Sequence, residues 1–194
     1  MKNGSTARGI GVFRNRQVQH ESGLEQRVCK ILQSRHDVRH LRSQYPKVDY
    51  VGSDGKSHHH TFDYWIELTD GWRVAVAVKQ EKKRKEMNEV LDRILAKGSP
   101  LFDDAILMTE KYANWDAYAN AADIVWSREH HDAVEVNKLM GELKGRSTVQ
   151  FYQLLTQQEF KTRNIAIWRL IEMGHLKAKR PGRITQTSWF NVNL

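Results

Sequence analysis

The stretch His60–Gln80, HTFDYWIELTDGWRVAVAVKQ, predicts a β-hairpin around which we expect the chain to fold. Residues alternate in character on both sides of Asp70-Gly71, which is typical of two strands joined by a tight turn. A two-residue loop would place Asp63 opposite Val78, so that a carboxylate would lie on the valine face. A three-residue loop, Thr69–Gly71 with glycine in the left-handed conformation, leaves that face purely apolar, and we adopt this register.

The adopted register brings a carboxylate and an ammonium group together at one end of the hairpin. Asp63 faces Ala77, and Lys79 lies diagonally next to Asp63, whereas Glu67 faces Arg73 at the other end. A carboxylate binds a hard divalent cation through oxygen, and an ammonium group can orient a water molecule or stabilise phosphate charge. Asp63 and Lys79 are therefore candidates for a metal-dependent phosphodiesterase site, with an ordinary cross-strand ion pair as the alternative.

A helix is predicted to begin near Ser22. Ser22-Gly23-Leu24-Glu25 has the pattern of a capping box, and apolar residues follow it at helical spacing. Glu25 has two candidate roles, because its carboxylate can either cap the helix or take part in the site. The consecutive histidines 58–60 point to alternate faces of a strand and cannot easily converge on one ion, so we expect only His60 to approach the site.

Three segments accompany the hairpin in a fixed order: HESGLEQRV (20–28), VRHLRSQYP (38–46) and HTFDYWI (60–66). Together with Asp63 and the V-x-V-K sequence that ends at Lys79, they resemble the PD-(D/E)xK, restriction-endonuclease-like superfamily. Within it, the chain most resembles TnsA-type transposon-end endonucleases. The resemblance implies an α/β fold with a mixed sheet flanked by helices, and hydrolysis of DNA phosphodiester bonds with Mg²⁺ or Mn²⁺ to leave a 5′ phosphate.

The resemblance also implies roles for individual residues. Asp63 would be a metal ligand, Glu25 a direct or outer-sphere ligand, and Lys79 the group that positions water or stabilises charge on the phosphate. Gln80 would supply a polar contact. The family has Glu or Gln two residues before the lysine, but this chain has Ala77 there.

The alanine at position 77 leaves three interpretations open. Another carboxylate replaces the missing one, with Glu81 and Glu67 nearest in the sequence, or the site binds metal poorly, or catalysis has been lost. A nuclease-fold protein that binds DNA or a partner without cutting is therefore one rival function. A winged-helix transcription regulator, whose N-terminal domain only senses or dimerises, is another.

The net charge of +8 is concentrated at the two ends of the chain. Residues 1–43 contain nine Lys and Arg against three Asp and Glu, and residues 144–194 contain nine against two, whereas acids are in excess between them. Such clustering favours nucleic-acid binding, with a solvated basic surface as the alternative. The candidate DNA-binding residues are Arg14, Arg16, Lys82, Lys83, Arg84, Lys85, Arg163, Arg169, Lys179, Arg180 and Arg183.

The chain is expected to comprise a flexible basic arm (1–19), a nuclease-like domain (20–145) and a small winged-helix domain (146–194). The nuclease-like domain would continue through strands at 105–109 and 123–126, with helices at 110–120 and 131–143. Beyond Gly145, two helices at 147–157 and 160–173 precede a hairpin with a basic tip, which is a winged-helix pattern. The second helix would be the reader and the hairpin the wing.

Composition limits the compartment and the partners. Cys29 is the only cysteine, so an intramolecular disulfide and a cysteine-based zinc cluster are excluded. No apolar run is long enough to span a bilayer, and we expect a soluble protein in the cytoplasm of a bacterial or phage-infected cell. The resemblance implies DNA, a transposase, a regulatory ATPase and a second copy of the chain as partners, in transposition or a related mobile-element or phage process.

Overall fold

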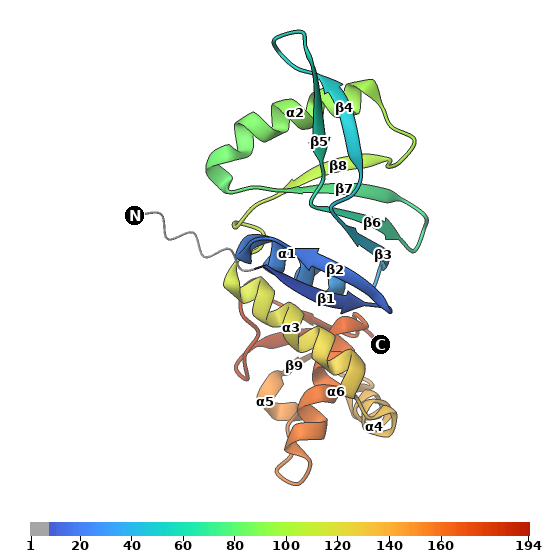
Figure 1. Cartoon of the computed structure of the whole chain (residues 1–194). Helices are drawn as coiled ribbons and strands as arrows, with labels where there is room; N and C mark the ends of the chain where they lie inside the picture. The colour runs from blue at the N-terminus through green and yellow to red at the C-terminus, as the bar shows by residue number, and fades with distance from the viewer. Residues whose placement is uncertain (1–7) are drawn as a thin grey trace. The chain divides into compact units, whose positions relative to one another are not determined.

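The computed structural model describes residues 8–194, which belong to two compact units (Figure 1). Of the described residues, unit 1 comprises 8–33 and 37–114, and unit 2 comprises 34–36 and 115–194. The division into compact units falls after Asn114, whereas the sequence analysis expected a domain boundary at Gly145. No helix in residues 8–194 is long and apolar enough to cross a membrane.

Unit 1 is built on a mixed four-stranded sheet. Its strands are β3 (Val38–Ser43), β6 (Tyr64–Leu68), β7 (Arg73–Val78) and β8 (Asp104–Met108), in the order β3-β6-β7-β8. The first three are antiparallel, whereas β8 is parallel to β7 and is reached through the short helix η1 (Glu81–Lys83) and the helix α2 (Arg84–Lys97).

The predicted register of the central hairpin is confirmed. Glu67 pairs with Arg73, and Tyr64 pairs with Val76, so the loop is the three-residue one. Gly71 has a φ of +88°, a conformation that glycine adopts without the steric cost that a Cβ would bring. The sequence pattern alone was sufficient here because only this register separates the carboxylates from the valine face.

Both faces of the sheet are buried. On one face, Trp65, Ala75 and Ala77 pack against Met87 and Leu91 of α2. Side chains alternate along a strand, so Tyr64 points to the other face, where its hydroxyl donates a hydrogen bond to the backbone oxygen of Glu25 in α1 (Gly23–Ser34) at 3.1 Å. The sheet therefore carries a helix on each side, as expected for an α/β fold.

Two separate ribbons extend unit 1. One is formed by β1 (Gly9–Phe13) and β2 (Arg16–His20), and the other by β4 (Lys47–Val51) and β5 (Ser57–Thr61). The first ribbon corrects the expectation of a flexible arm, because its buried Phe13 and Val18 attach it to the unit. Of the expected arm, residues 1–7 lie outside the part that the structure describes.

Unit 2 combines four helices with a small antiparallel sheet. The helices are α3 (Trp115–His130), α4 (Ala133–Leu143), α5 (Phe151–Leu154) and α6 (Phe160–Glu172). The strands β9 (Thr148–Gln150), β10 (Leu176–Ala178) and β11 (Trp189–Val192) form a sheet in the order β10-β11-β9. Its core combines residues from helices and sheet, among them Leu139, Val149, Ile167, Leu170 and Phe190.

Three expected elements of the later chain differ from the structure. The strand at 123–126 is the middle of α3, and the expected helix at 110–120 begins only at Trp115. A short apolar run fits a buried strand as well as a turn of helix, so its periodicity could not decide between them. The expected helix at 147–157 is divided between β9 and α5, because residues 148–150 pair with β11, which is distant in the sequence.

Candidate active site and nucleic-acid contacts

Asp63 and Lys79 meet at the end of the central hairpin, as predicted. Asp63 immediately precedes β6 and is only 8% exposed. Its Oδ2 atom accepts a hydrogen bond from the Val78 backbone N–H at 2.7 Å and lies 3.6 Å from Lys79 Nζ. Burial raises the pKa of Asp63, although Lys79 and the Val78 N–H act in the opposite direction.

Glu25 lies in the first turn of α1, and its carboxylate caps that helix. Its Oε1 atom accepts a hydrogen bond from Ser22 Oγ at 2.8 Å, and Oε2 accepts one from the Glu21 backbone N–H at 2.8 Å. Ser22 Oγ in turn accepts from the Glu25 N–H, which completes the predicted capping interaction. The same carboxylate contributes to raising the pKa of Asp63, so the two acids lie within electrostatic range.

His60 adds a neutral imidazole to this region. Its Nε2 atom is buried and has no hydrogen-bond partner among the described residues, and its ring lies edge-on to Phe62 with centroids 4.7 Å apart. Burial, and secondarily the positive charge of Lys79, lowers the pKa of His60 to about 4. His60 is therefore uncharged at neutral pH, and Lys79 is the cation of this group.

The neighbours of Lys79 in the sequence do not supply the missing acid. Ala77 is fully buried against α2, and Gln80 is exposed at the position before η1, where its side chain makes no capping hydrogen bond. Glu67 lies four residues beyond Asp63, at the opposite end of β6. In residues 8–194, no three His, Cys, Asp or Glu side chains form a group that could hold a metal ion.

The Glu81 carboxylate is occupied by hydrogen bonds and ion pairs with neighbouring residues. Its carboxylate accepts two hydrogen bonds from Arg84 at 2.8 Å each and one from Thr109 Oγ1 at 2.7 Å, and it lies 2.9 Å from Lys111 Nζ. These contacts, led by those from Arg84, hold the pKa of Glu81 well below its usual range. Glu81 thus connects η1 to the end of β8. The spacing of Glu81 and Arg84 indicates their ion pair, but not the contact with Thr109.

The carboxylates that remain fit a cation that needs few protein ligands. Each carboxylate offers about four acceptor positions, so Asp63 and Glu25 keep lone pairs beyond their observed hydrogen bonds. Mg²⁺ is commonly held by one or two carboxylates and keeps several waters. A nearby cation would also favour the charged form of the buried Asp63. Two carboxylates therefore match the number of protein ligands that Mg²⁺ commonly uses.

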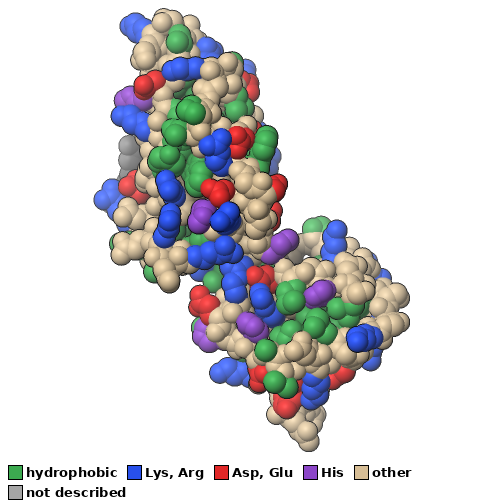
Figure 2. All heavy atoms as spheres, turned by 90° about the vertical axis from the view of Figure 1, so that its right-hand side faces the viewer, with side chains coloured by type: hydrophobic (Ala, Val, Ile, Leu, Met, Phe, Trp, Pro, Cys, Tyr) green, Lys and Arg blue, Asp and Glu red, His purple; other side chains and the backbone are tan. Residues whose placement is uncertain are grey.

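The predicted DNA-binding residues fall into two groups. Most lie exposed on the surface, and on the face seen in Figure 2 Lys and Arg side chains are spread over both units among apolar and acidic ones. Arg84 is engaged with Glu81, and Lys83 lies 3.2 Å from Glu86. The exposed members are Arg14, Arg16, Lys82, Lys83, Arg84, Lys85, Lys179, Arg180 and Arg183.

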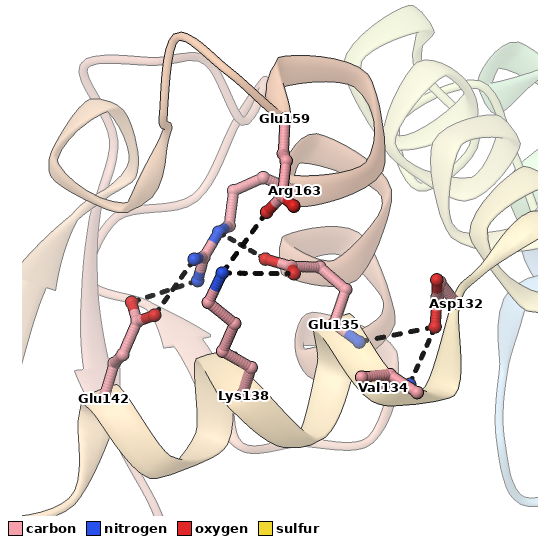
Figure 3. A network of polar contacts seen from close by, with 7 residues as sticks. All are labelled: Asp132, Val134, Glu135, Lys138, Glu142, Glu159 and Arg163. Carbon is pink, nitrogen blue, oxygen red and sulfur yellow. Dashed lines mark hydrogen bonds and ion pairs between the residues drawn. The ribbon is translucent and has the colours of Figure 1, made fainter.

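The prediction is wrong for Arg163, which is buried, and Arg169 is only partly exposed. Arg163 is 1% exposed and extends from α6 between two acids of α4, with Nε 2.7 Å from Glu135 and two hydrogen bonds of 3.0 Å to Glu142 (Figure 3). Arg169 pairs with Glu172 of its own helix. The Arg163 guanidinium is therefore not exposed to a phosphate backbone, whereas the Arg169 side chain is 25% exposed beside its partner Glu172.

The expectation that α6 reads DNA is also not supported. Helix α6 packs against both α3 and α4, and its residues 165–168 are all buried. Four consecutive residues span a full turn of an α-helix, so no side of its middle is free to enter a groove. Arg183 from the β10–β11 loop lies 2.7 Å from Asp123 of α3 and stacks on Trp168 of α6.

Comparison with known proteins does not assign the chain to a family. No protein-family model matches it, and no curated protein is significantly similar to it in sequence.

Proposed function

We propose that the chain is a divalent-metal-dependent DNA endonuclease of the TnsA type. The observation that carries the proposal is the pairing of buried Asp63 with Lys79 at 3.6 Å, within electrostatic range of the Glu25 carboxylate. A mixed sheet with a helix on each face, as the resemblance implies, supports it. The order of α5, α6 and the β10–β11 hairpin supports a winged-helix assignment for unit 2.

Each side chain of the site would have a distinct task. Asp63 and Glu25 would hold the divalent ion, which when bound polarises a phosphoryl oxygen and acidifies a coordinated water. The Val78 N–H fixes the orientation of the Asp63 carboxylate. The Lys79 side chain is 41% exposed, so its remaining N–H groups can reach a phosphate and stabilise negative charge that develops there.

Cleavage of supercoiled plasmid in Mg²⁺ or Mn²⁺ tests the proposal. We expect nicking by the wild type, its loss in EDTA, and a decrease of about 10²–10³-fold in Asp63→Asn and Lys79→Ala. Lys56→Ala is the matched control, because it removes another exposed cation of unit 1, in the turn between β4 and β5, that is not among the candidate DNA-binding residues. Wild-type rates in both site variants would contradict the assignment.

A second candidate function is binding of DNA by the same fold without cutting. Two observations favour it: the buried methyl group of Ala77 stands where the family has a metal ligand, and both oxygens of Glu25 already cap α1. Under this alternative, the wild type binds DNA and leaves it intact in either metal. Cleavage by the wild type that depends on Asp63 would exclude it.

The resemblance extends the proposal to partners. DNA is the substrate, and a transposase and a regulatory ATPase are the proteins with which such an enzyme would act, in the cytoplasm of a bacterial or phage-infected cell. If cutting appears only when those partners are present, the proposal is retained in this extended form, provided that Asp63→Asn still abolishes it.

A further inference from the structure

A pocket rich in hydrogen-bond donors lies on the loop between β10 and β11 of unit 2. We call it the loop pocket, and its lining includes Lys179, Arg180, Thr185, Thr187, Ser188 and Trp189. No acidic residue lines it. None of the ion pairs in residues 8–194 involves Lys179 or Arg180, so both charges are uncompensated.

The hydroxyl groups of the loop pocket add donors to these cations. Ser188 Oγ accepts a hydrogen bond from the Thr185 N–H at 2.9 Å, which leaves its own proton for another partner. Thr185 Oγ1 and Thr187 Oγ1 lie 3.0 Å apart, and only one of them can donate to the other, so a second hydroxyl proton is left over. Ammonium, guanidinium and hydroxyl donors without a carboxylate form a site for an oxyanion such as a phosphate.

The loop is held in place by hydrogen bonds that do not use these donors. Gln150 Nε2 donates to the Thr187 backbone oxygen at 2.9 Å, and the Lys179 N–H donates to the Trp189 oxygen at 2.8 Å. Asn120 of α3 binds the loop at two points, Gly182 O and the Ile184 N–H. The loop backbone is thus held in place before any ligand arrives, which reduces the entropy cost of binding.

Trp189 places an aromatic surface beside the positive charges. Its side chain is 45% exposed, whereas Phe190, the next residue of β11, is fully buried. Sites for single-stranded nucleic acid combine cations that follow the backbone with aromatic side chains on which unpaired bases stack. A base within a duplex is not free to stack in this way, and the burial of α6 removes the expected groove reader from unit 2.

We propose that the loop pocket binds single-stranded nucleic acid, with a phosphate held by Lys179, Arg180 and the hydroxyls, and an unpaired base stacked on Trp189. The proposal goes beyond the cleavage function and does not depend on it. Its residues are separate from Asp63 and Lys79, so binding can be measured in EDTA, where no metal-dependent cutting occurs.

The test is fluorescence anisotropy of a labelled oligothymidylate with the full chain in EDTA at low salt. We expect Trp189→Ala to weaken binding by about tenfold, since stacking of one base is worth roughly 1–3 kcal/mol, and Trp189→Phe to retain most of it. Lys179→Ala/Arg180→Ala should weaken binding and make its salt dependence shallower by about two phosphate contacts. Trp126→Ala and Lys161→Ala, exposed residues elsewhere in unit 2, are the matched controls.

Three results would overturn the proposal. If Trp189→Ala binds as tightly as the wild type and unfolds at the same temperature, no base stacks on Trp189. A duplex of the same length that binds as tightly and depends equally on Trp189 would contradict the preference for single strands. Competition by polyglutamate at the same charge concentration as the oligonucleotide would show a general acidic site that suits a protein partner.

Discussion

Asp63 is held in an environment that opposes its charge. Burial dominates over Lys79 and the Val78 N–H, so the pKa of Asp63 is raised in the folded protein. Folding therefore favours the protonated form, and stability falls as pH rises above the ordinary pKa of about 3.8 for Asp. A buried carboxylate with a raised pKa and a specific charged partner is a candidate for a functional site.

We expect Asp63→Asn to stabilise the protein at pH 7 by about 1 kcal/mol, because the amide can still accept from Val78 without a buried charge. The melting temperature should rise by about 2–4 °C for a protein of this size. The gain should shrink near pH 3.5, where Asp63 itself is protonated. A lower melting temperature for the variant at pH 7 would show that the ion pair with Lys79 is the dominant interaction.

His60 gives a pH dependence of the opposite sign. Its folded-state pKa of about 4 lies below the ordinary 6.5, so it contributes stability that is present above pH 6.5 and lost as pH falls toward 4. As the pH falls over that range, we expect the free energy of unfolding of His60→Phe to decrease by about 2 kcal/mol less than that of the wild type. This figure allows for solvent screening of the partly exposed ring. Urea denaturation at pH 7 and pH 4 measures the difference, and identical losses in both proteins would contradict it.

At the level of elements, the start of α1 combines a structural and a proposed catalytic role in Glu25. Two variants separate them. Ser22→Ala removes the helix cap and leaves the carboxylate, and we expect it to cost about 1 kcal/mol of stability while cutting persists. Glu25→Gln removes the charge, and we expect it to reduce cutting by about 10²-fold or more. Equal cleavage by both variants would show that Glu25 caps the helix and has no role in catalysis.

The packing of α4 against α6 is stabilised by the ion pairs of Arg163. Removing this guanidinium leaves the buried Glu135 without its 2.7 Å partner, and we expect Arg163→Met to destabilise the protein by about 3–5 kcal/mol. The double variant Arg163→Met/Glu135→Leu should recover most of that loss, because no uncompensated charge is left buried. A double variant as unstable as the single one, measured by chemical denaturation, would contradict this explanation.

Elements fixed by local pattern were predictable, and elements fixed by distant pairing were not. The register of β6 and β7 followed from alternation and one glycine, and the start of α1 followed from Ser22 and Glu25. In contrast, β9 exists because it pairs with a strand about forty residues later in the sequence. The same holds for the candidate functional residues. Spacing in the sequence predicted that Asp63 lies near Lys79, but only the structure shows that Arg163 is buried.

For the whole molecule, fewer basic residues are available for binding than the number in the sequence suggests. In residues 144–194, Arg163 and Arg169 neutralise buried acids, whereas Lys179 and Arg180 lie free at the loop pocket. Composition counts every cation, but only exposed and unpaired ones release counterions from DNA. Clustering of charge in the sequence therefore does not identify which cations at this end of the chain are available for binding.

The most direct test of the central claim is a plasmid-nicking assay in Mg²⁺ and Mn²⁺ that compares wild type, Asp63→Asn and Ala77→Glu. We expect the wild type to nick and Asp63→Asn to be inactive. Ala77→Glu places the carboxylate of TnsA-type enzymes at a position that is fully buried here, so we expect it to nick and to unfold at a lower temperature than the wild type. An inactive wild type beside an active Ala77→Glu would contradict the endonuclease assignment and indicate a DNA-binding protein that has lost catalysis.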